Sequence, residues 1–302
     1  EVVEMHGEPG NFRVKIKRKA PKVNWDDCTG CGACQEKCPK LVTTNFFERS
    51  VGTKKAIYTL SPQAIPNKPV IDVENCRYLT EGKCGVCSKI CPVGAIRYDQ
   101  EDYYVEEEVA AIVVATGFDL YPIEAMGEYG YGKVPDVIDG LAMERMCSAS
   151  GPTAGEVRRP SDGKVPQSIV FIQCVGSRDP EHHKPYCSRV CCMYTAKHAR
   201  LYKHKVHDGK AFLLYMDIRS TGKGYEEFIQ QSTEEEGLIY LRGRVSRIFR
   251  EGDKVMVWGA DTISGKAVEV AADMVVLATA IVPNPEQVAL AAAVLRAMEP
   301  QA

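Results

Sequence analysis

The stretch Cys28-Thr29-Gly30-Cys31-Gly32-Ala33-Cys34-Gln35-Glu36-Lys37-Cys38-Pro39 has the spacing C-x2-C-x2-C-x3-C-P. This spacing is typical of bacterial ferredoxins, whose thiolates hold [4Fe–4S] clusters. The small residues between the cysteines allow backbone N–H groups to approach the sulfur atoms. The stretch therefore predicts a ferredoxin-like fold with an iron–sulfur centre.

A second cysteine block, C-x7-C-x2-C-x3-C-P, ends at Cys91-Pro92. In two-cluster ferredoxins the fourth cysteine of each block binds the other cluster. We therefore expect one [4Fe–4S] cluster on Cys28, Cys31, Cys34 and Cys91, and a second on Cys38, Cys76, Cys84 and Cys87. A pair of zinc ribbons is the alternative, because C-x2-C pairs also suit zinc. Two complete four-cysteine blocks, each ending in Cys-Pro, favour the clusters.

A third set of cysteines has the unusual spacing C-x12-C-x3-C-C and comprises Cys174, Cys187, Cys191 and Cys192. Adjacent cysteines can serve one cubane because its iron corners are separated. A helix is predicted over residues 189–201, and the dipole at its N-terminus would stabilise an anionic cluster. The alternative is a buried or redox-active thiol pair. Cys147 has no nearby partner in sequence and is predicted to be a structural thiol.

The remaining sequence has an α/β pattern. Residues 103–109 and 111–115 are predicted strands, the second buried, and a similar strand is predicted over residues 274–280. Strands at residues 168–173 and 211–216 fit a nicotinamide-binding domain. However, the turn after the first of these lacks the G-x-G-x-x-G fingerprint that would hold a pyrophosphate. We expect that nucleotide site to be lost, with Asp217 structural.

The predicted fold class is α/β, with an incomplete Rossmann-like, two-dinucleotide-binding-domain flavoprotein core and an inserted α+β ferredoxin-like domain. Five segments are expected: a strand hairpin (1–22), the ferredoxin-like domain (23–102), part of an FAD-binding domain (103–160), a degenerate nicotinamide-type domain with the third cluster (161–285) and a truncated return to the FAD domain (286–302). The last includes a predicted helix over residues 288–298. Because residue 1 is Glu, we expect an internal fragment or a naturally split subunit.

Composition excludes several classes of protein. The chain of 302 residues has 38 basic and 40 acidic side chains, a net charge of −2 and an isoelectric point near 6.4. Nucleic acids and anionic membranes are therefore not expected partners. Apolar runs are too short to span a bilayer, and no signal peptide is predicted, which favours the cytoplasm. Without a secretory signal, the 13 cysteines are interpreted as metal ligands rather than disulfides.

Together these features resemble the A-subunit family of heterodisulfide reductases, most specifically through residues 171–179 and 186–194. The resemblance implies a thioredoxin-reductase-like flavin core with an inserted ferredoxin domain, three [4Fe–4S] clusters and FAD. It places the expected flavin contacts at Thr116, Gly117, Lys197, Thr279 and Ala280. The resemblance also implies a catalytic role for Lys197, whose charge would stabilise a reduced flavin. Two departures stand out: no G-x-G-x-x-G precedes Cys28, and Ala280 stands where the family usually has Gly.

The resemblance implies an electron-transfer subunit that is active only within a complex. It would pass electrons between FAD and the clusters, with flavin-based electron bifurcation. Expected partners are other heterodisulfide reductase-like subunits, ferredoxin, hydrogenase or formate dehydrogenase subunits, and a second copy in a homodimer of the larger complex. One alternative is a non-catalytic cluster-bearing scaffold with a dead flavin site. Another is a dithiol–disulfide oxidoreductase using Cys191 and Cys192, which ranks last because vicinal cysteines form strained rings.

Overall fold

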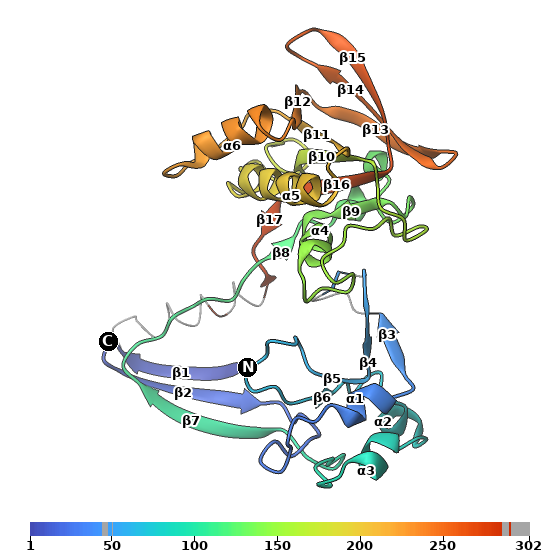
Figure 1. The fold of residues 1–302 in the computed structure, drawn as a ribbon. Helices are drawn as coiled ribbons and strands as arrows, with labels where there is room; N and C mark the ends of the chain where they lie inside the picture. The colour runs from blue at the N-terminus through green and yellow to red at the C-terminus, as the bar shows by residue number, and fades with distance from the viewer. Residues whose placement is uncertain (44–47, 50, 286–289, 291–302) are drawn as a thin grey trace. The chain divides into compact units, whose positions relative to one another are not determined.

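The structure, a computed structural model, describes residues 1–43, 48–49, 51–285 and 290 (Figure 1). Two compact units emerge. Unit 1 comprises Glu1–Phe47, Thr53–Asp119 and Pro283–Ala302, and unit 2 comprises Glu48–Gly52 and Leu120–Val282. Most of the helix predicted over residues 288–298, and of the segment 286–302, lies outside the described residues.

Unit 1 contains a three-stranded antiparallel sheet in the order β1-β2-β7 (Figure 1). Its strands are β1 (Val2–Glu8), β2 (Asn11–Arg18) and β7 (Tyr103–Val109). Alternation along the hairpin turns Met5, Phe12 and Val14 inward to a small apolar cluster. In the register of the sheet, Arg18 pairs with Tyr103, so the chain between them leaves and re-enters the sheet at neighbouring positions.

The segment between β2 and β7 carries both ferredoxin-like cysteine blocks. Its elements are short: α1 (Ala33–Lys37), β3 (Leu41–Thr43), β4 (Thr53–Lys55), β5 (Ile57–Tyr58), β6 (Val70–Ile71), α2 (Arg77–Glu81) and α3 (Val86–Ile90). Strand β3 pairs with β4, and β5 pairs with β6, both antiparallel. The apolar core of this segment is small and is built around Val23, Ile57, Ala95 and three buried thiols.

Unit 2 is built on a five-stranded parallel sheet in the order β12-β11-β10-β16-β9. The strands are β9 (Val137–Asp139), β10 (Ser168–Val175), β11 (Lys210–Tyr215), β12 (Ile239–Arg242) and β16 (Met274–Thr279). Helices α5 (Cys191–Lys205) and α6 (Tyr225–Glu234) form the crossovers from β10 to β11 and from β11 to β12. This topology confirms the Rossmann-like α/β prediction for residues 168–216.

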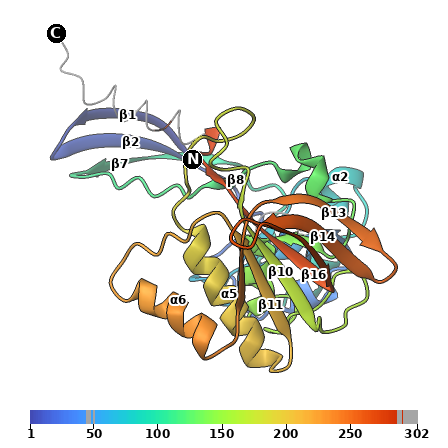
Figure 2. The ribbon, with the colours of Figure 1, turned by 90° about the horizontal axis from the view of Figure 1, so that it is seen from above.

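The two faces of this sheet are covered differently (Figure 2). Ile169 and Phe171 pack toward α4 (Gly140–Cys147) and α5. Val170 and Ile172 pack toward an antiparallel sheet in the order β13-β14-β15. That sheet consists of β13 (Val245–Glu251), β14 (Lys254–Asp261) and β15 (Lys266–Ala272). Because both faces are buried, β10 and β16 are nearly continuous apolar runs.

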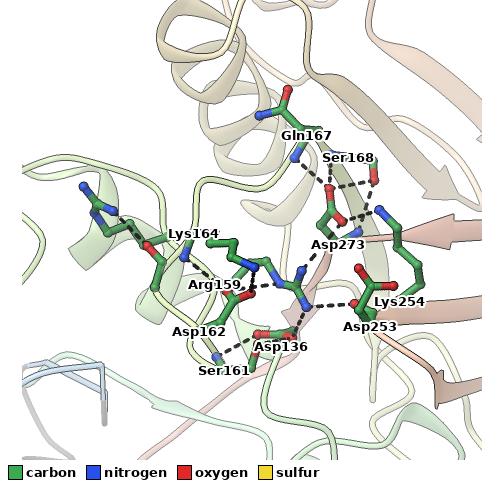
Figure 3. A network of polar contacts seen from close by, with 12 residues as sticks. Asp136, Arg159, Ser161, Asp162, Lys164, Gln167, Ser168, Asp253, Lys254 and Asp273 are labelled. Atoms are coloured by element: carbon green, nitrogen blue, oxygen red, sulfur yellow. Dashed lines mark hydrogen bonds and ion pairs between the residues drawn. The ribbon is translucent and has the colours of Figure 1, made fainter.

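Strand β8 (Asp119–Leu120) contains the boundary between the two units in the sequence and pairs with β17 (Ile281–Val282). Unit 2 also contains the 3-10 helices η1 (Ile123–Ala125) and η2 (Gly127–Tyr129). A buried polar network lies at the amino ends of β9, β10 and β16 (Figure 3). There the guanidinium of Arg159 contacts the carboxylates of Asp136 and Asp273 at 3.2 and 3.9 Å. This network lies at the end of the sheet opposite the third cysteine set.

One strand prediction is wrong. Residues 111–115 were expected to form a buried strand, but they form no regular secondary structure. Val113 is 89% exposed and Val114 is 46% exposed. An all-apolar strand is buried only where neighbouring strands pair with it on both sides, and no described strand pairs with this segment.

Candidate iron–sulfur sites

The first cavity is lined by the thiols expected to bind one cluster: Cys28, Cys31, Cys34 and Cys91. The backbone N–H of Gly30 donates to Cys28 Sγ at 3.4 Å, and that of Ala95 donates to Cys91 Sγ at 3.2 Å. Such donors stabilise thiolate sulfur. The cavity thus joins three thiols of the first block with the fourth thiol of the second.

The second cavity is lined by the other expected set: Cys38, Cys76, Cys84 and Cys87. Tyr98 Oη lies 2.9 Å from Cys87 Sγ at its wall. The same wall carries Tyr78, whose ring stacks on that of Tyr98 with centroids 3.9 Å apart. Sequence reasoning missed these two tyrosines.

Local backbone geometry explains why each fourth cysteine crosses to the other cavity. Helices α1 and α3 each follow a left-handed glycine, Gly32 at φ 77° and Gly85 at φ 88°. Each helix ends after five residues at a C-cap cysteine, Cys38 or Cys91, in extended conformation. The extended backbone carries that thiol away from the thiols of its own block, and α1 and α3 pack against each other.

Burial controls the chemistry of these thiols. Desolvation raises the pKa of Cys34 to about 11 and also raises that of Cys87. Without metal, these groups are therefore neutral thiols near pH 7. Iron must displace their protons, as metals do at thiolate sites. Among the described residues, no group of three or more His, Cys, Asp or Glu side chains is arranged to hold a metal ion. The eight thiols instead surround two open spaces.

The third set gathers at the carboxyl end of β10, where open parallel sheets bind their ligands. Cys174 has φ 60°, and the β10–β16 register shifts between Ile172 and Val175. Such a bulge changes the direction of a side chain. Cys191 and Cys192 begin α5, and Cys187 lies in the loop before it. Each of Cys174, Cys191 and Cys192 has its pKa raised by burial and by the negative charge of other members of the set, so the four thiols lie together.

Hydrogen-bond donors surround this set. The N–H of Arg219 donates to Cys192 Sγ at 3.3 Å, and that of Arg189 donates to Cys187 Sγ at 3.3 Å. Two further buried donors, Gln173 Nε2 and Arg178 Nη1, have no hydrogen-bond partner among the described residues. Buried donors without acceptors are rare, so they indicate a missing acceptor. An anionic sulfur-rich cluster is an acceptor of the required sign, and the residues present therefore fit such a group.

Asp217 occupies the place where a nicotinamide-binding domain carries its ribose-binding acid. Here its carboxylate pairs with Arg178 at 2.7 Å and with Arg242 at 3.4 Å. The Arg178 guanidinium holds the pKa of Asp217 below its usual value. The carboxylate thus anchors an arginine beside Cys174, in agreement with the structural role predicted for it.

The expected flavin contacts fall in different units. Thr116 and Gly117 belong to unit 1, in the irregular stretch after β7, whereas Thr279 ends β16 and Ala280 follows it in unit 2. The Ala280 side chain is fully buried, and its N–H donates to Val175 O at 2.8 Å. Neither unit by itself assembles a dinucleotide site from these residues, so the structure supports no step through a flavin.

Lys197, predicted to act beside a flavin, lies on α5 and contacts α4. Its Nζ lies 2.5 Å from Glu144 Oε2, and the same oxygen contacts His198 Nε2 at 2.5 Å. The His198 hydrogen bond is the largest cause that lowers the pKa of Glu144 to about 2. Glu144 was missed from the sequence, because nothing in an isolated Glu on a helix indicates a partner more than fifty residues away.

No helix in the described part of the chain combines the length and the apolarity needed to cross a bilayer.

Comparison with known proteins agrees with the cysteine chemistry. Residues 21–42 match the family model of the 4Fe–4S binding domain. The chain is 48% identical over 284 residues to the A subunit of H(2):CoB-CoM heterodisulfide,ferredoxin reductase from Methanothermobacter thermautotrophicus, covering 94% of this chain and 42% of that protein. It is 43% identical over 293 residues to the iron-sulfur A subunit of CoB–CoM heterodisulfide reductase from Methanocaldococcus jannaschii, covering 96% and 44%. The chain therefore spans less than half the length of these relatives.

Among solved structures, thioredoxin reductase of T. acidophilum is similar at 13% identity with a TM-score of 0.37, covering 63% of this chain and 49% of that one.

Proposed function

We propose that the chain is the cluster-bearing electron-transfer part of a heterodisulfide reductase A subunit. The chain belongs to that family, and it spans 42–44% of the length of the two relatives named above. It holds three [4Fe–4S] clusters and passes electrons between them and FAD. In the whole protein this transfer serves flavin-based electron bifurcation, with ferredoxin and a disulfide as acceptors.

The observation that carries the proposal is the crosswise sorting of eight thiols into two cavities. Each cavity takes three thiols from one block and one from the other. This is the ligand exchange of a two-cluster ferredoxin. A zinc ribbon would instead close on the cysteines of its own pairs.

The chain's residues prepare these sites for charge transfer. When bound, each [4Fe–4S] cluster accepts and releases single electrons. Gly32 and Gly85 let short helices start beside the sulfur atoms, and the backbone N–H groups of Gly30 and Ala95 stabilise negative charge there. Val23 and Ile57, both at most 2% exposed, exclude water from the cavity walls.

The third set would hold the cluster nearest to the flavin. The four thiols and the unpaired donors Gln173 Nε2 and Arg178 Nη1 supply ligands and neutralising contacts for it. Both thiols of the vicinal pair are buried, Cys191 at 4% and Cys192 at 6% exposure. A disulfide substrate therefore has little access to them, which disfavours the dithiol oxidoreductase alternative.

Thr116, Gly117, Thr279 and Ala280 are the FAD contacts that we propose, on the resemblance alone. Lys197 would then place its positive charge near the flavin ring. The names of the relatives include ferredoxin, H2, formate and the word subunit, which favours sister subunits, ferredoxin and a hydrogenase or formate dehydrogenase as partners. We also expect a second copy of the chain in the larger complex. We place the complex in the cytoplasm.

The crosswise assignment is tested by replacing each fourth cysteine separately. Cys91→Ala should remove the signal of the cluster held by Cys28, Cys31 and Cys34, and Cys38→Ala should remove the other. Each variant should lose about four irons of about twelve per chain. Cys147→Ala is the matched control and should lose none.

Iron analysis and EPR of the reduced protein, purified without oxygen, measure this result. Cys38→Ala and Cys28→Ala losing the same EPR signal would contradict the crosswise assignment. Clusters that stay oxidised throughout a reductive titration would instead support the scaffold alternative.

A further inference from the structure

Tyr98 makes a side-chain contact that distinguishes the second cavity from the first. Its Oη lies 2.9 Å from Cys87 Sγ, and geometry alone allows either atom to donate the hydrogen. A thiolate that binds iron carries no proton, so in the loaded site only the phenol can donate. The half-buried ring is held in place by its stacking on Tyr78, so the hydroxyl stays directed at this sulfur.

Positive charge also lies at the wall of the second cavity. Lys40 and Arg77 are among its lining residues. Lys40 is half-buried, and Arg77 is exposed with a distant partner in Glu81 at 3.8 Å. A partner at that distance does not fully cancel the charge of Arg77, so both cations favour an additional electron inside the cavity.

The first cavity differs in its walls. Among the described residues it is lined by no charged and no aromatic side chain; apart from its four cysteines, its walls are small or apolar residues such as Val23, Ala95 and Ile96. Donation to sulfur there comes from the backbone N–H groups of Gly30 and Ala95. The two sites are therefore similar in ligands but unlike in electrostatics.

We propose that Tyr98 is a positioning residue that acts through Cys87 on a reduction potential. Its O–H donation to Cys87, together with the charges of Lys40 and Arg77, gives the second cluster the higher reduction potential of the ferredoxin-like pair. That cluster is the one on Cys38, Cys76, Cys84 and Cys87. This inference rests on the proposed function. Hydrogen bonds to cluster sulfur and nearby positive charge stabilise the reduced, more negative cluster. One electron moves from the reduced first cluster to the oxidised second, the first is reoxidised, and the phenol keeps its proton.

The direction of transfer follows from this difference. An electron that arrives at the first cluster moves to the second, which is the reduced member of the pair at equilibrium. The asymmetry lies in the chain's own residues, because the two ligand sets have the same chemical composition.

The test is Tyr98→Phe in the full chain, purified without oxygen and titrated reductively with EPR detection. The higher midpoint potential should shift to a more negative value, while the lower one stays unchanged. Tyr78→Phe is the matched control, because it removes a hydroxyl from the stacked ring that donates to none of the described sulfur atoms; it should shift neither potential. Cys84→Ser identifies the signal of the second cluster by altering its ligand.

Each possible result supports or overturns the role proposed for Tyr98. An unchanged higher potential in Tyr98→Phe with full iron content overturns the role of Tyr98. Loss of the second cluster in Tyr98→Phe also overturns it, because the hydroxyl would then serve assembly rather than potential. Lys40→Gln tests the charge contribution independently and should shift the same midpoint in the same direction. Absence of iron from the unmodified protein would refute the proposed function itself.

Discussion

Two of the predicted ligands and two arginines near them hold a backbone conformation that their side chains disfavour. Cys84 has φ 102° and Cys174 has φ 60°, and Arg178 and Arg189 adopt φ 60° and 67°. Left-handed conformations are costly for non-glycine residues and persist where the surrounding structure requires them. Here they bring thiols and donors to the second cavity and to the third set. Cysteine spacing predicted the ligands, but nothing in the sequence predicts the strained backbone.

Among residues away from the clusters, we expect substitution of Arg159 to lower the free energy of unfolding most (Figure 3). Its side chain is 7% exposed and contacts Asp136, which is 1% exposed. Arg159→Met should lower the free energy of unfolding of unit 2 by about 3 kcal/mol, because it leaves a buried carboxylate without its cation. Urea unfolding followed by Trp258 fluorescence, in a Trp25→Phe background, measures this.

The neighbouring Arg158 gives the control. It is exposed and pairs with exposed Glu156, so Arg158→Met should change the free energy of unfolding by less than about 0.5 kcal/mol. Equal effects of the two substitutions would show that the buried network does not stabilise the fold.

Side-chain contacts between residues far apart in the sequence could not be predicted from the sequence. Tyr98 was missed because its phenol approaches Cys87 only after α3 and the following loop have folded. Lys197 was predicted from a resemblance, whereas its contact with Glu144 depends on how α4 and α5 pack. Residue types and spacing predict ligands that act together within a motif. They do not predict partners brought in by tertiary packing.

Two apolar stretches that look alike in the sequence have different structures. The strand predicted over residues 274–280 is present as β16 (Met274–Thr279), which is fully buried and pairs with β10 and β9. Residues 111–115 have a similar apolar run but no described strand beside them, and all of them except the half-buried Ile112 are exposed. Apolar composition indicates that a strand would be stable when buried. Whether such a strand is buried depends on which strands pair with it, and the sequence of the segment itself does not specify those strands.

The turn after β10 is the element on which the third cluster should depend. Gly176 has φ 72°, and a Cβ added there would lie 2.5 Å from Cδ1 of Tyr121. Gly176→Ala should therefore displace the turn that follows Cys174 at the end of β10. We expect a loss of about four irons of about twelve per chain, with both ferredoxin-like EPR signals intact.

Gly163→Ala is the matched control for this substitution. Gly163 has φ 70°, and an added Cβ there meets nothing within 4 Å among the described residues. It introduces the same backbone strain without the collision, so iron content should be unchanged. If both variants kept all their iron, the third set would not hold a cluster in the way proposed.

At the scale of the whole molecule, the cysteines organise both units. The inserted segment between β2 and β7 has a small apolar core to which cysteines contribute, so cluster ligation should supply much of its stability. Unit 2 has a large buried sheet and needs its thiols only at the carboxyl end of β10. This division was predictable because the cysteine motifs and the strand pattern are both local signals.

The most direct test of the central claim is the iron and sulfide content per chain, measured together with EPR of dithionite-reduced material that has never met oxygen. Three cubanes predict about twelve irons with about as many sulfides, and signals that appear on reduction. Zinc in place of iron, or only about four irons per chain, would contradict the account.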